Sequence, residues 1–541
     1  MSGVAEGAPE TARANAEAAA VLARSLVAGG VRHVVMSPGS RSTPLVLAFA
    51  DADARTHVVL DERVAAFVAL GLARVAGPVA LVCTSGSAGA HWLPAVIEAR
   101  HSRVPLILLT ADRPPELHGC GAPQTVPQAE LFAPYALLRV DVGPASAGVD
   151  PRWLRTVAAR LLDAARGPVH ANVAFREPLW EPGAKPVAVE PARILRPPPT
   201  ADASTAAAVA ERLVGRGVIY AGPRAAPPGD RAVGAAVARL GAALGWPVVA
   251  EPLSQLRGHS TGAVLGMEPP EVVLRLGQPP TRRRVAERLV GAETVLVDPD
   301  GDWLDPSHTT TLLAAVEPAS LCEALVPRVR PADPAWLAAW EAADADARAR
   351  AASLCDTLWE GAVAREVAAA LPPSGLLHVA SSMPVRDLDA FAPPAPFAVT
   401  SNRGANGIDG TIATALGASL GWRGPVVALV GDLAFLHDHA ALHAARALGA
   451  RLVVVVADNG GGGIFGTLPI ARHEGAFERL FLTPQPGDLA AAAAGLGAYA
   501  VRVDDLQALR RSLSEALARD GVTVIHAVVD RETANARRAR L

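Results

Sequence analysis

The sequence predicts an α/β protein built from three tandem, doubly wound parallel-sheet domains. Short apolar runs, typical of buried parallel strands, alternate with Ala- and Leu-rich helical segments through most of the 541 residues. A chain of this length is too long for one hydrophobic core, so about three domains are expected. We expect them over residues 1–192, 193–352 and 353–541, with a proline-rich linker from Arg193 and a polar helix over 334–352 as connectors.

The first domain shows the alternation most regularly. Its predicted helices are Ala16–Val27, Thr43–Ala54, Glu62–Val75 and Ala88–Ala99, and its predicted strands are His33–Met36, His57–Leu60, Val79–Cys83 and Leu106–Thr110. The central domain repeats the pattern more loosely, with strands near Val218–Ala221, Val248–Ala250 and Thr294–Val297. The third domain has predicted strands at Leu376–Val379, Phe397–Thr400, Val426–Val430, Leu452–Val456 and Val522–Val529. The first and third domains are the most alike in rhythm.

Composition narrows the class of protein. Hydrophobic residues make up 50% of the chain and aromatic residues only 4%, which predicts an interior of Ala, Val and Leu. The net charge of −3 argues against a nucleic-acid partner. No apolar run approaches the roughly 20 residues of a membrane span, and Met1–Ala14 lacks a signal-peptide core. We therefore expect a cytoplasmic protein without membrane insertion.

Lysine and cysteine usage excludes several chemistries. The four cysteines show no CxxC pairing and are expected to be free thiols. The only lysine, Lys185, lies between prolines in a loop-like segment, and no GxxxxGK phosphate loop is present. A Schiff-base lysine would have to be Lys185, so pyridoxal-dependent and lysine-aldolase chemistry are not expected.

Two polar strand endings in the third domain carry the strongest chemical signal. Asp432 follows the apolar run Val426–Val430, and Asn459 follows Leu452–Val456. Open α/β sheets bind ligands at the carboxyl ends of their strands. A carboxylate, an amide oxygen and the Gly461 carbonyl would suit Mg²⁺ holding a diphosphate. The Gly-Asp pair, the gap and the Asn match the thiamine-diphosphate motif; two ordinary strand-end turns are the alternative.

A carboxylate in the first domain fits the same cofactor. In Leu60-Asp61-Glu62-Arg63 a predicted strand gives way to a helix. Thiamine diphosphate becomes reactive only when its aminopyrimidine shifts to the imino form, which needs a carboxyl group at ring nitrogen N1′. Glu62 is predicted for this role and Asp61 is the local alternative. A helix-capping acid is the non-catalytic interpretation.

Small-residue loops follow several predicted strands. The loops over 37–44 and 84–91 are either anion cradles at helix starts or ordinary strand-to-helix connections. The segments 381–386 and 401–410 take the same place in the third domain. Ile408 is either the wedge that bends the cofactor or a core residue. His437 and His439 are interpreted as helix-surface residues rather than metal ligands.

These segments together resemble a known family. SPGSRSTPL, LDER, TSGSA, LTADRPPEL with CGAPQ, SNRGANGIDG, GDLAFLHD and NGGGGIF occur in this order between residues 37 and 465. They are similar to the 2-succinyl-5-enolpyruvyl-6-hydroxy-3-cyclohexene-1-carboxylate synthases, thiamine-diphosphate enzymes of menaquinone biosynthesis. The Gly-Asp-Leu of this chain, in place of Gly-Asp-Gly, is itself a mark of that family.

The resemblance implies an architecture and a reaction. It implies the thiamine-diphosphate enzyme architecture, with pyrimidine-binding, central and diphosphate-binding domains in that order. The cofactor would lie between the first and last domains of two subunits, in a homodimer or homotetramer. The implied reaction is decarboxylation of 2-oxoglutarate and 1,4-addition of the resulting succinyl carbanion to isochorismate, with release of CO₂.

The resemblance also implies roles for single residues. Glu62 would activate the cofactor, and Asp432, Asn459 and Gly461 would bind Mg²⁺ or Mn²⁺. The other implied cofactor contacts are Ser37, Gly39, Thr84, Gly86, Ile408, Gly431, Leu433, Gly462 and Ile464. The implied substrate contacts are Ser40, Arg41, Arg113, Gln124, Arg283, Ser382, Arg386, Arg403, Phe465 and Leu468. Arginine suits this task, because both substrates are dicarboxylates and guanidinium groups bind carboxylates with two hydrogen bonds.

The sequence departs from the family pattern at three positions, and two other functions remain as alternatives. His91 stands where the family usually has Asn, Ala434 where it has Ser or Thr, and Asp458 where it has Asn. Another thiamine-diphosphate decarboxylase or carboligase, such as one of the acetolactate-synthase type, would be favoured by a flavin or nucleotide site in the central domain, and no dinucleotide fingerprint is seen there. A non-catalytic binding module is opposed by the joint presence of Glu62, Asp432 and Asn459.

Overall fold

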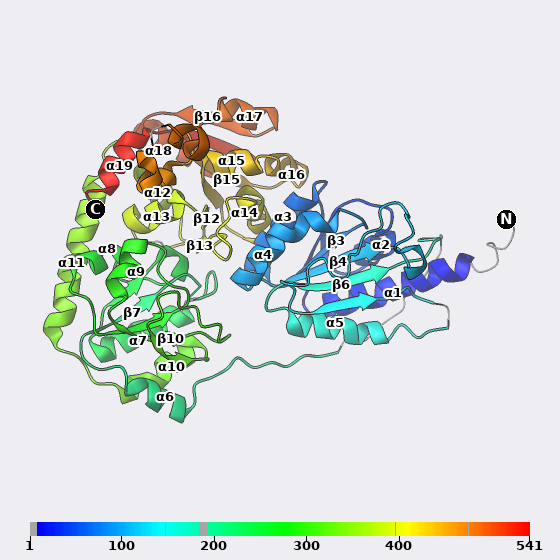
Figure 1. The fold of residues 1–541 in the computed structure, drawn as a ribbon, viewed down its shortest axis with the longest axis horizontal. Coiled ribbons are helices and arrows are strands. Elements are labelled where there is room, and N and C mark those ends of the chain that lie inside the picture. The colour runs from blue at the N-terminus through cyan, green and yellow to red at the C-terminus, as the bar shows by residue number, and fades with distance from the viewer. Residues whose placement is uncertain are drawn as a thin grey trace.

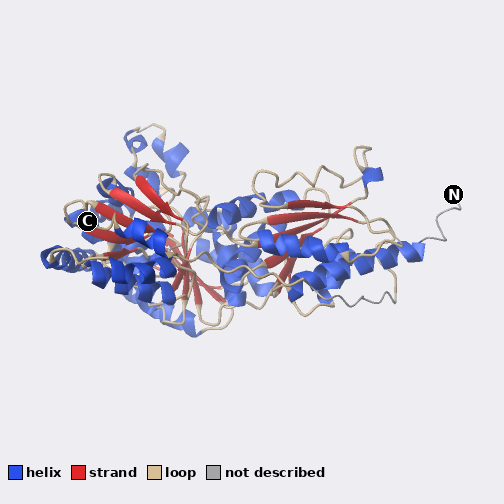
Figure 2. Cartoon of the chain, turned by 90° about the horizontal axis from the view of Figure 1, so that it is seen from below, coloured by secondary structure: helices blue, strands red, loops and turns tan. Residues whose placement is uncertain are grey.

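Three parallel sheets, each covered by helices, make up the chain (Figures 1 and 2). The computed structural model describes residues 8–146, 148–182, 190, 192–224, 226–394, 396–473 and 475–541. Lys185 lies outside the described residues. The predicted class, three tandem α/β units with parallel sheets, is confirmed. The domain boundaries after residues 192 and 352 stay predictions.

The first sheet has six parallel strands in the order β2-β1-β3-β4-β6-β5. Its strands are β1 (His33–Met36), β2 (Arg55–Val58), β3 (Val79–Cys83), β4 (Leu106–Asp112), β5 (Arg139–Val142) and β6 (Val169–Ala174). Its helices are α1 (Ala8–Ala28), α2 (Thr43–Ala50), α3 (Glu62–Ala76), α4 (Leu93–Ser102) and α5 (Trp153–Ala164). Alternate strand residues pack on α1, α2 and α5 on one face and on α3 and α4 on the other. Both faces are thus buried, as parallel sheets require.

Several first-domain elements differ from their predicted bounds. Helix α1 begins at Ala8 rather than Ala16, and α2 ends at Ala50 rather than Ala54. β2 begins at Arg55 rather than His57, because Arg55 pairs with His33 of β1, and Leu60 is left 73% exposed after the strand. The helix expected over Ala88–Ala99 is divided into a 3₁₀ turn, Gly89–Trp92, and α4, which has Pro94 in its first turn. Proline is tolerated at that position because the first N–H groups of a helix have no partner within it.

The central sheet has five parallel strands in the order β11-β10-β9-β7-β8. Its strands are β7 (Gly217–Ala221), β8 (Val248–Ala250), β9 (Val272–Leu276), β10 (Glu293–Val297) and β11 (Thr310–Ala314). Its helices are α6 (Ala203–Ala210), α7 (Ala232–Leu244), α8 (Thr261–Gly266), α9 (Arg283–Leu289) and α10 (Pro318–Leu325). The long helix α11 (Pro334–Ser353) then runs along the outer edge toward the third sheet (Figure 1).

The third sheet repeats the topology of the first, with the order β13-β12-β14-β15-β17-β16. Its strands are β12 (Leu376–Val379), β13 (Ala398–Thr400), β14 (Val426–Gly431), β15 (Leu452–Asp458), β16 (Tyr499–Val503) and β17 (Val522–Val528). Its helices are α12 (Glu360–Ala370), α13 (Met383–Phe391), α14 (Thr411–Gly421), α15 (Asp432–Asp438), α16 (Ala441–Ala447), α17 (Leu489–Gly495), α18 (Leu506–Ala518) and α19 (Arg531–Arg538). The expected likeness of the first and third domains is confirmed by this shared strand order.

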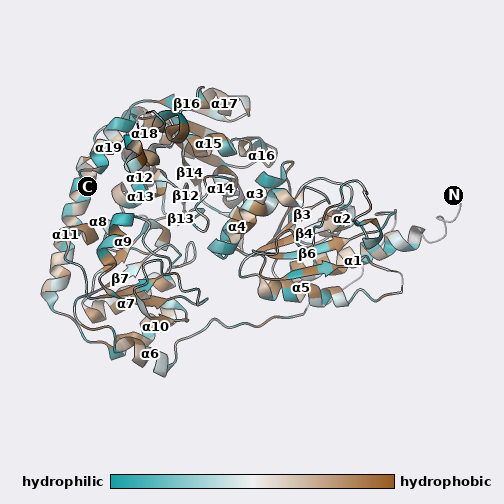
Figure 3. Cartoon of the chain, in the orientation of Figure 1, coloured by the Kyte–Doolittle hydropathy of each residue, from teal (hydrophilic) through white to brown (hydrophobic). Residues whose placement is uncertain are grey.

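Hydropathy separates the sheets from the outer helices. Brown, apolar segments gather in the strands and in the helices between the first and third sheets, whereas α9 and α19 are largely teal (Figure 3). Within the described residues, no helix combines the length and the apolar character that a membrane crossing requires.

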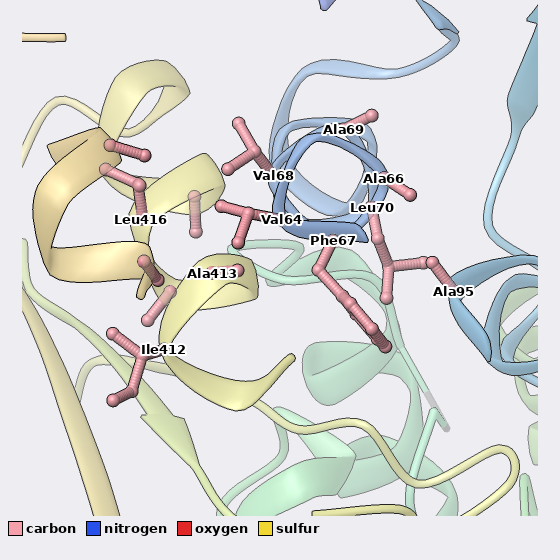
Figure 4. Close-up of a cluster of buried hydrophobic side chains, with 14 of the residues drawn as sticks. Val64, Ala66, Phe67, Val68, Ala69, Leu70, Ala95, Ile412, Ala413 and Leu416 are labelled. Carbon is pink, nitrogen blue, oxygen red and sulfur yellow. The ribbon is translucent and has the colours of Figure 1, made fainter. Parts of the chain in front are cut away.

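Helices α3 and α14 join the first and third domains through a backbone-to-backbone contact (Figure 4). A Cβ atom on Gly71 would lie 1.9 Å from the Thr414 carbonyl oxygen, and one on Gly417 would lie 1.9 Å from the Val68 carbonyl oxygen. The ring of Phe67 fills the space beside Gly410, where a Cβ would lie 2.0 Å from the ring. Only glycine permits the helices to approach this closely, so their sequence fixes how the two domains sit together.

A buried glutamate makes hydrogen bonds and an ion pair across the same interface, which we call the Glu98 lock. Glu98 of α4 accepts hydrogen bonds from the backbone N–H groups of Gly404 (3.0 Å) and Ala405 (2.7 Å), in the loop before α14. It also forms an ion pair with Arg74 of α3 (2.9 Å), and both side chains are buried. Arg74 in turn donates to Asn402 Oδ1 (3.3 Å). First-domain side chains therefore determine the conformation of a third-domain loop.

The close contact of α3 and α14 predicts that position 71 tolerates no side chain larger than that of glycine. Gly71→Ala is expected to destabilise the protein by at least about 3 kcal/mol, because the helices must separate to relieve a clash with backbone. The matched control is Gly234→Ala within α7, where a Cβ meets only one side-chain atom, at 4.0 Å. That change should be neutral or stabilising by up to about 1 kcal/mol. Thermal unfolding measures both, and an unchanged midpoint for Gly71→Ala would contradict the close crossing.

The ion pair of Glu98 with Arg74 predicts that removing the Glu98 charge lowers the free energy of unfolding. Glu98→Gln would leave the Arg74 guanidinium buried without its counter-charge, a loss of about 3 kcal/mol. Glu130→Gln is the control, since Glu130 pairs with Arg139 but its side chain is 72% exposed. Such surface pairs contribute about 0–1 kcal/mol. Denaturant titration distinguishes the two, and equal losses for both variants would mean that Glu98 is not a lock.

Candidate functional site

A cavity of about 160 Å³ lies at the carboxyl ends of β12, β14 and β15. Loops after these strands and the start of α12 form its walls. The lining residues are Glu360, Ser381, Ser382, Met383, Pro384, Ile408, Leu429, Gly431, Asp432, Leu433, Ala434, Ala457, Asn459, Gly461, Gly462, Gly463, Ile464 and Phe465. The structure thus brings together the three residues predicted to bind metal, Asp432, Asn459 and Gly461.

Asp432 is a buried carboxylate beside a second one. It is the first residue of α15, where backbone N–H groups are free to meet an acid. Burial and then the neighbouring Asp458 carboxylate raise the pKa of Asp432 to about 7, against the effect of the Leu433 and Gly461 N–H groups. A divalent cation beside Asp432 would offset this repulsion, so the electrostatics fit a metal.

Asn459 presents an unsatisfied oxygen. Its Nδ2 donates to Glu360 Oε1 (2.7 Å), whereas its Oδ1 is buried and has no hydrogen-bond partner in the described part of the chain. A buried oxygen without a partner carries a desolvation cost that a cation would remove.

Gly461 holds a conformation that requires glycine. Its φ is +131°, and a Cβ there would lie 2.2 Å from the Leu482 carbonyl oxygen. Its own carbonyl accepts the Gly463 N–H (2.8 Å), which leaves a second lone pair. Carboxylate, amide and carbonyl oxygens together fit the ligand preference of Mg²⁺ or Mn²⁺.

Of the other cofactor and substrate contacts predicted in the third domain, some line this cavity and others do not. Those that line the cavity are Ile408, Gly431, Leu433, Gly462, Ile464, Phe465 and Ser382. Ser382 has a φ of +70°, a strained conformation for a residue with a side chain. Leu468 is not among the lining residues and is largely exposed.

Two predicted arginines lie near this cavity without lining it. Arg386 donates to the Ser382 carbonyl (2.5 Å). Arg403 lines a different cavity, of about 440 Å³, at the junction of the three domains. Burial and then the charge of Arg386 lower the pKa of Arg403, so the two guanidinium groups are neighbours.

Arg283 is not brought to either cavity. Its side chain is 85% exposed at the start of α9 and pairs with Glu287 (2.6 Å). The adjacent Arg282 is the one that turns inward, donating to Thr261 Oγ1 (3.2 Å). Nothing in the sequence distinguishes which of these three consecutive arginines faces the interior.

The predicted first-domain residues gather at the carboxyl edge of the first sheet. Gly39 and Thr84 touch, since a Cβ on Gly39 would lie 2.3 Å from Thr84 Cβ. Gly86, with φ +88°, packs against Gln124. Ser37 is buried, and its hydroxyl has no partner in the described residues. These loops therefore form one surface rather than separate turns.

Cationic side chains converge at this edge. Arg113 donates to Ser85 Oγ and to the Gln124 carbonyl (2.9 Å). Arg41 is buried and donates to the Phe175 carbonyl (3.1 Å) and Glu177 (2.8 Å), while Ser40 beside it is exposed. Burial and then Arg41 lower the pKa of Arg113. Two neighbouring guanidinium groups suit an anionic ligand.

Glu62 is the first residue of α3, and the helix cap is its neighbour. Asp61 accepts the N–H groups of Arg63 (2.9 Å) and Val64 (3.2 Å), so the capping interpretation applies to Asp61. Glu62 is half-buried and, after burial itself, raises the pKa of the Cys83 thiol at the end of β3. No first-domain residue is among those lining the Asp432 cavity. Glu62 and Asp432 thus belong to separate clusters of one chain.

Sequence reasoning missed residues that act over long separations. Glu360 and Glu98 contact Asn459 and Gly404 from other elements, and no motif marks them. Asp458, noted as a departure, accepts a hydrogen bond from His526 Nε2 (2.7 Å) on the adjacent strand β17. His437 and His439 are exposed, as expected for helix-surface residues.

Comparisons with known proteins agree with these clusters. Residues 16–132 match the family described as the thiamine pyrophosphate enzyme, N-terminal TPP binding domain, and residues 387–527 match the C-terminal TPP binding domain. A benzoylformate decarboxylase structure from Polynucleobacter necessarius superposes with a TM-score of 0.75 over 95% of this chain and 99% of that one, at 18% identity, and shows the fold alone.

Two curated relatives carry the same printed name, 2-succinyl-5-enolpyruvyl-6-hydroxy-3-cyclohexene-1-carboxylate synthase. The relative from Myxococcus xanthus is 43% identical over 95% of this chain and 94% of its own length. The one from Geobacillus kaustophilus is 41% identical over 94% of each chain. This protein therefore belongs to the 2-succinyl-5-enolpyruvyl-6-hydroxy-3-cyclohexene-1-carboxylate synthase family of thiamine pyrophosphate enzymes.

Proposed function

We propose that this protein decarboxylates 2-oxoglutarate and adds the remaining succinyl unit to isochorismate, releasing CO₂, in menaquinone biosynthesis. The observation that carries the proposal is the Asp432–Asn459–Gly461 cavity in a chain of this family. When bound, thiamine diphosphate supplies the carbon nucleophile and electron sink that decarboxylation requires. The chain's own residues would hold it, orient the substrates and exclude water.

The metal end of the cofactor is assigned to the third domain. Asp432, Asn459 Oδ1 and the Gly461 carbonyl would bind Mg²⁺ or Mn²⁺, which would hold the diphosphate. Ile408 and Ile464 would form the apolar walls on either side of the reacting centre, and Phe465 would keep water out. Support comes from the unpartnered Asn459 oxygen and from the raised pKa of Asp432.

The pyrimidine end is assigned to the first domain of a second copy. In this arrangement the Glu62 carboxyl would meet ring nitrogen N1′ and could exchange a proton there, and Ser37, Gly39, Thr84 and Gly86 would line the adjoining wall. The support is that Glu62 does not line the Asp432 cavity of its own chain. A homodimer, or a homotetramer made of two such pairs, would complete two sites at once.

Substrate carboxylates are assigned to the guanidinium groups. Arg41 and Arg113 with Ser40 and Gln124 form one group, and Arg386 and Arg403 with Ser382 form the other. Their shared location at the two sheet edges supports the assignment, since dicarboxylates need several cations. The predicted substrate contacts of Leu468 and Arg283 lack this support, because Leu468 is exposed and the exposed Arg283 side chain pairs with Glu287. The cytoplasmic location and the absence of a nucleic-acid partner stay predictions.

The reaction itself is tested by omission. Purified protein with 2-oxoglutarate, isochorismate, thiamine diphosphate and Mg²⁺ should release CO₂ in step with product formation, and leaving out any one component should abolish product. Pyruvate replacing 2-oxoglutarate with equal efficiency would refute the substrate assignment. Manganese in place of magnesium should support turnover, because both ions accept this oxygen ligand set.

Glu62 provides the sharper test of the mechanism. Glu62→Gln should still bind thiamine diphosphate and Mg²⁺ but lose turnover by several orders of magnitude, because an amide cannot exchange the proton at N1′. Asp61→Asn is the matched control, since an Asn still caps α3 and turnover should stay close to that of the parent. More than a tenth of parental turnover in Glu62→Gln, a loss below about 1.4 kcal/mol, would contradict the role.

A further inference from the structure

Glu360 is a buried acid in the cavity wall. It is the first residue of α12 and is only 5% exposed. Its Oε1 accepts the Nδ2–H of Asn459 (2.7 Å), and its Oε2 is buried without a hydrogen-bond partner in the described residues. A buried carboxylate is costly, so its retention beside the cavity calls for a specific role.

The bond to Glu360 decides which way the Asn459 amide faces. An ionised carboxylate can only accept hydrogen bonds, whereas an amide has one donor end and one acceptor end. The donor end must therefore point at Glu360, which leaves Oδ1 as the free acceptor. With the amide reversed, two oxygens would repel each other and an N–H group would be the free end, which cannot bind a cation.

Glu360 is itself held by the helix α19. Arg538 Nη2 lies 3.4 Å from Glu360 Oε1, and the same guanidinium donates to both oxygens of Asp387 (2.8 and 2.5 Å). Arg538 also lies over the Trp359 ring, 5.6 Å from its centre. A planar guanidinium fixed on three sides gives Glu360 a defined location.

We propose that Glu360 is a positioning residue for the metal site: it orients the Asn459 amide oxygen toward the cation, and Arg538 holds Glu360 in place. The inference rests on the proposed metal role of Asn459. Ligand-orienting partners of this kind typically change metal affinity about 10- to 100-fold when removed. Neither Glu360 nor Arg538 belongs to a sequence motif that predicts the site.

The test measures Mg²⁺ affinity directly, by calorimetric titration of protein saturated with thiamine diphosphate. Glu360→Ala should weaken Mg²⁺ binding by about 10- to 100-fold. Glu360→Gln should restore most of the affinity, because a Gln oxygen can still accept the Asn459 N–H. The control is Glu366→Ala on the same helix, whose partner is Arg510 (2.8 and 2.6 Å), and its affinity should match that of the parent.

A double-mutant cycle separates positioning from general stability. In an Asn459→Ala background, Glu360→Ala should cause no further loss of Mg²⁺ affinity, because there is no amide to orient. Equal losses in both backgrounds would overturn the proposal, and so would an unchanged affinity in Glu360→Ala. Thermal unfolding of each cofactor-free variant shows whether it is folded.

Arg538→Met decides the matter if Glu360→Ala does not fold. It leaves the cavity lining intact, and it should weaken Mg²⁺ binding several-fold; parental affinity would then overturn the proposal. The proposed function fails separately: if the parent protein itself binds no Mg²⁺ in the presence of thiamine diphosphate, the metal assignment is wrong. Parental binding with unaffected variants rejects only the role of Glu360.

Discussion

The contact between the bare backbones of α3 and α14 is the constraint on which the rest of the structure depends. Gly71 and Gly417 let the two backbones touch at these positions, while side chains such as Val68 and Leu416 pack around the contact (Figure 4). That contact places α4 against the loop over 401–410, where Glu98 engages the backbone of Gly404. The same loop carries Arg403 and the cavity-lining Ile408, so side chains of the first domain help to set the geometry of a cavity wall in the third.

The third-domain cavity contains polar and charged groups that lack compensating partners. Asp432 lies beside Asp458 in a buried setting, and its pKa is raised for that reason. Asn459 supplies an oxygen with no partner among the described residues. Folded proteins rarely keep such groups unless a ligand completes them, because each costs free energy that packing must offset. These features of the cavity agree with the proposed metal role of Asp432 and Asn459.

Most strands and the main motif residues could be predicted from the sequence, because both are local. Val426–Val430 and Leu452–Val456 are apolar runs with polar endings, and the structure extends them by only one or two residues. The edge strands β5, β11 and β16 are not among the predicted strands, since their outward-facing residues blur the apolar pattern. The interior strands β6 and β9 are also missing from the prediction, although their residues are fully buried. Hydrogen-bond partners that lie far apart in the sequence could not be predicted for another reason. Nothing near Glu360 in the sequence indicates that its side chain contacts Asn459.

The tight joint between α3 and α14 also limits how this molecule can move. Domain closure around a substrate requires a hinge between the domains. The close crossing of α3 and α14 at their glycines prevents the first and third domains of one chain from rotating relative to each other. The first and third domains of a copy must turn as a single rigid body. Within this constraint, the wall of the Asp432 cavity that Gly463, Ile464 and Phe465 form belongs to the short 3₁₀ turn Gly463–Thr467, not to either of the two joined helices.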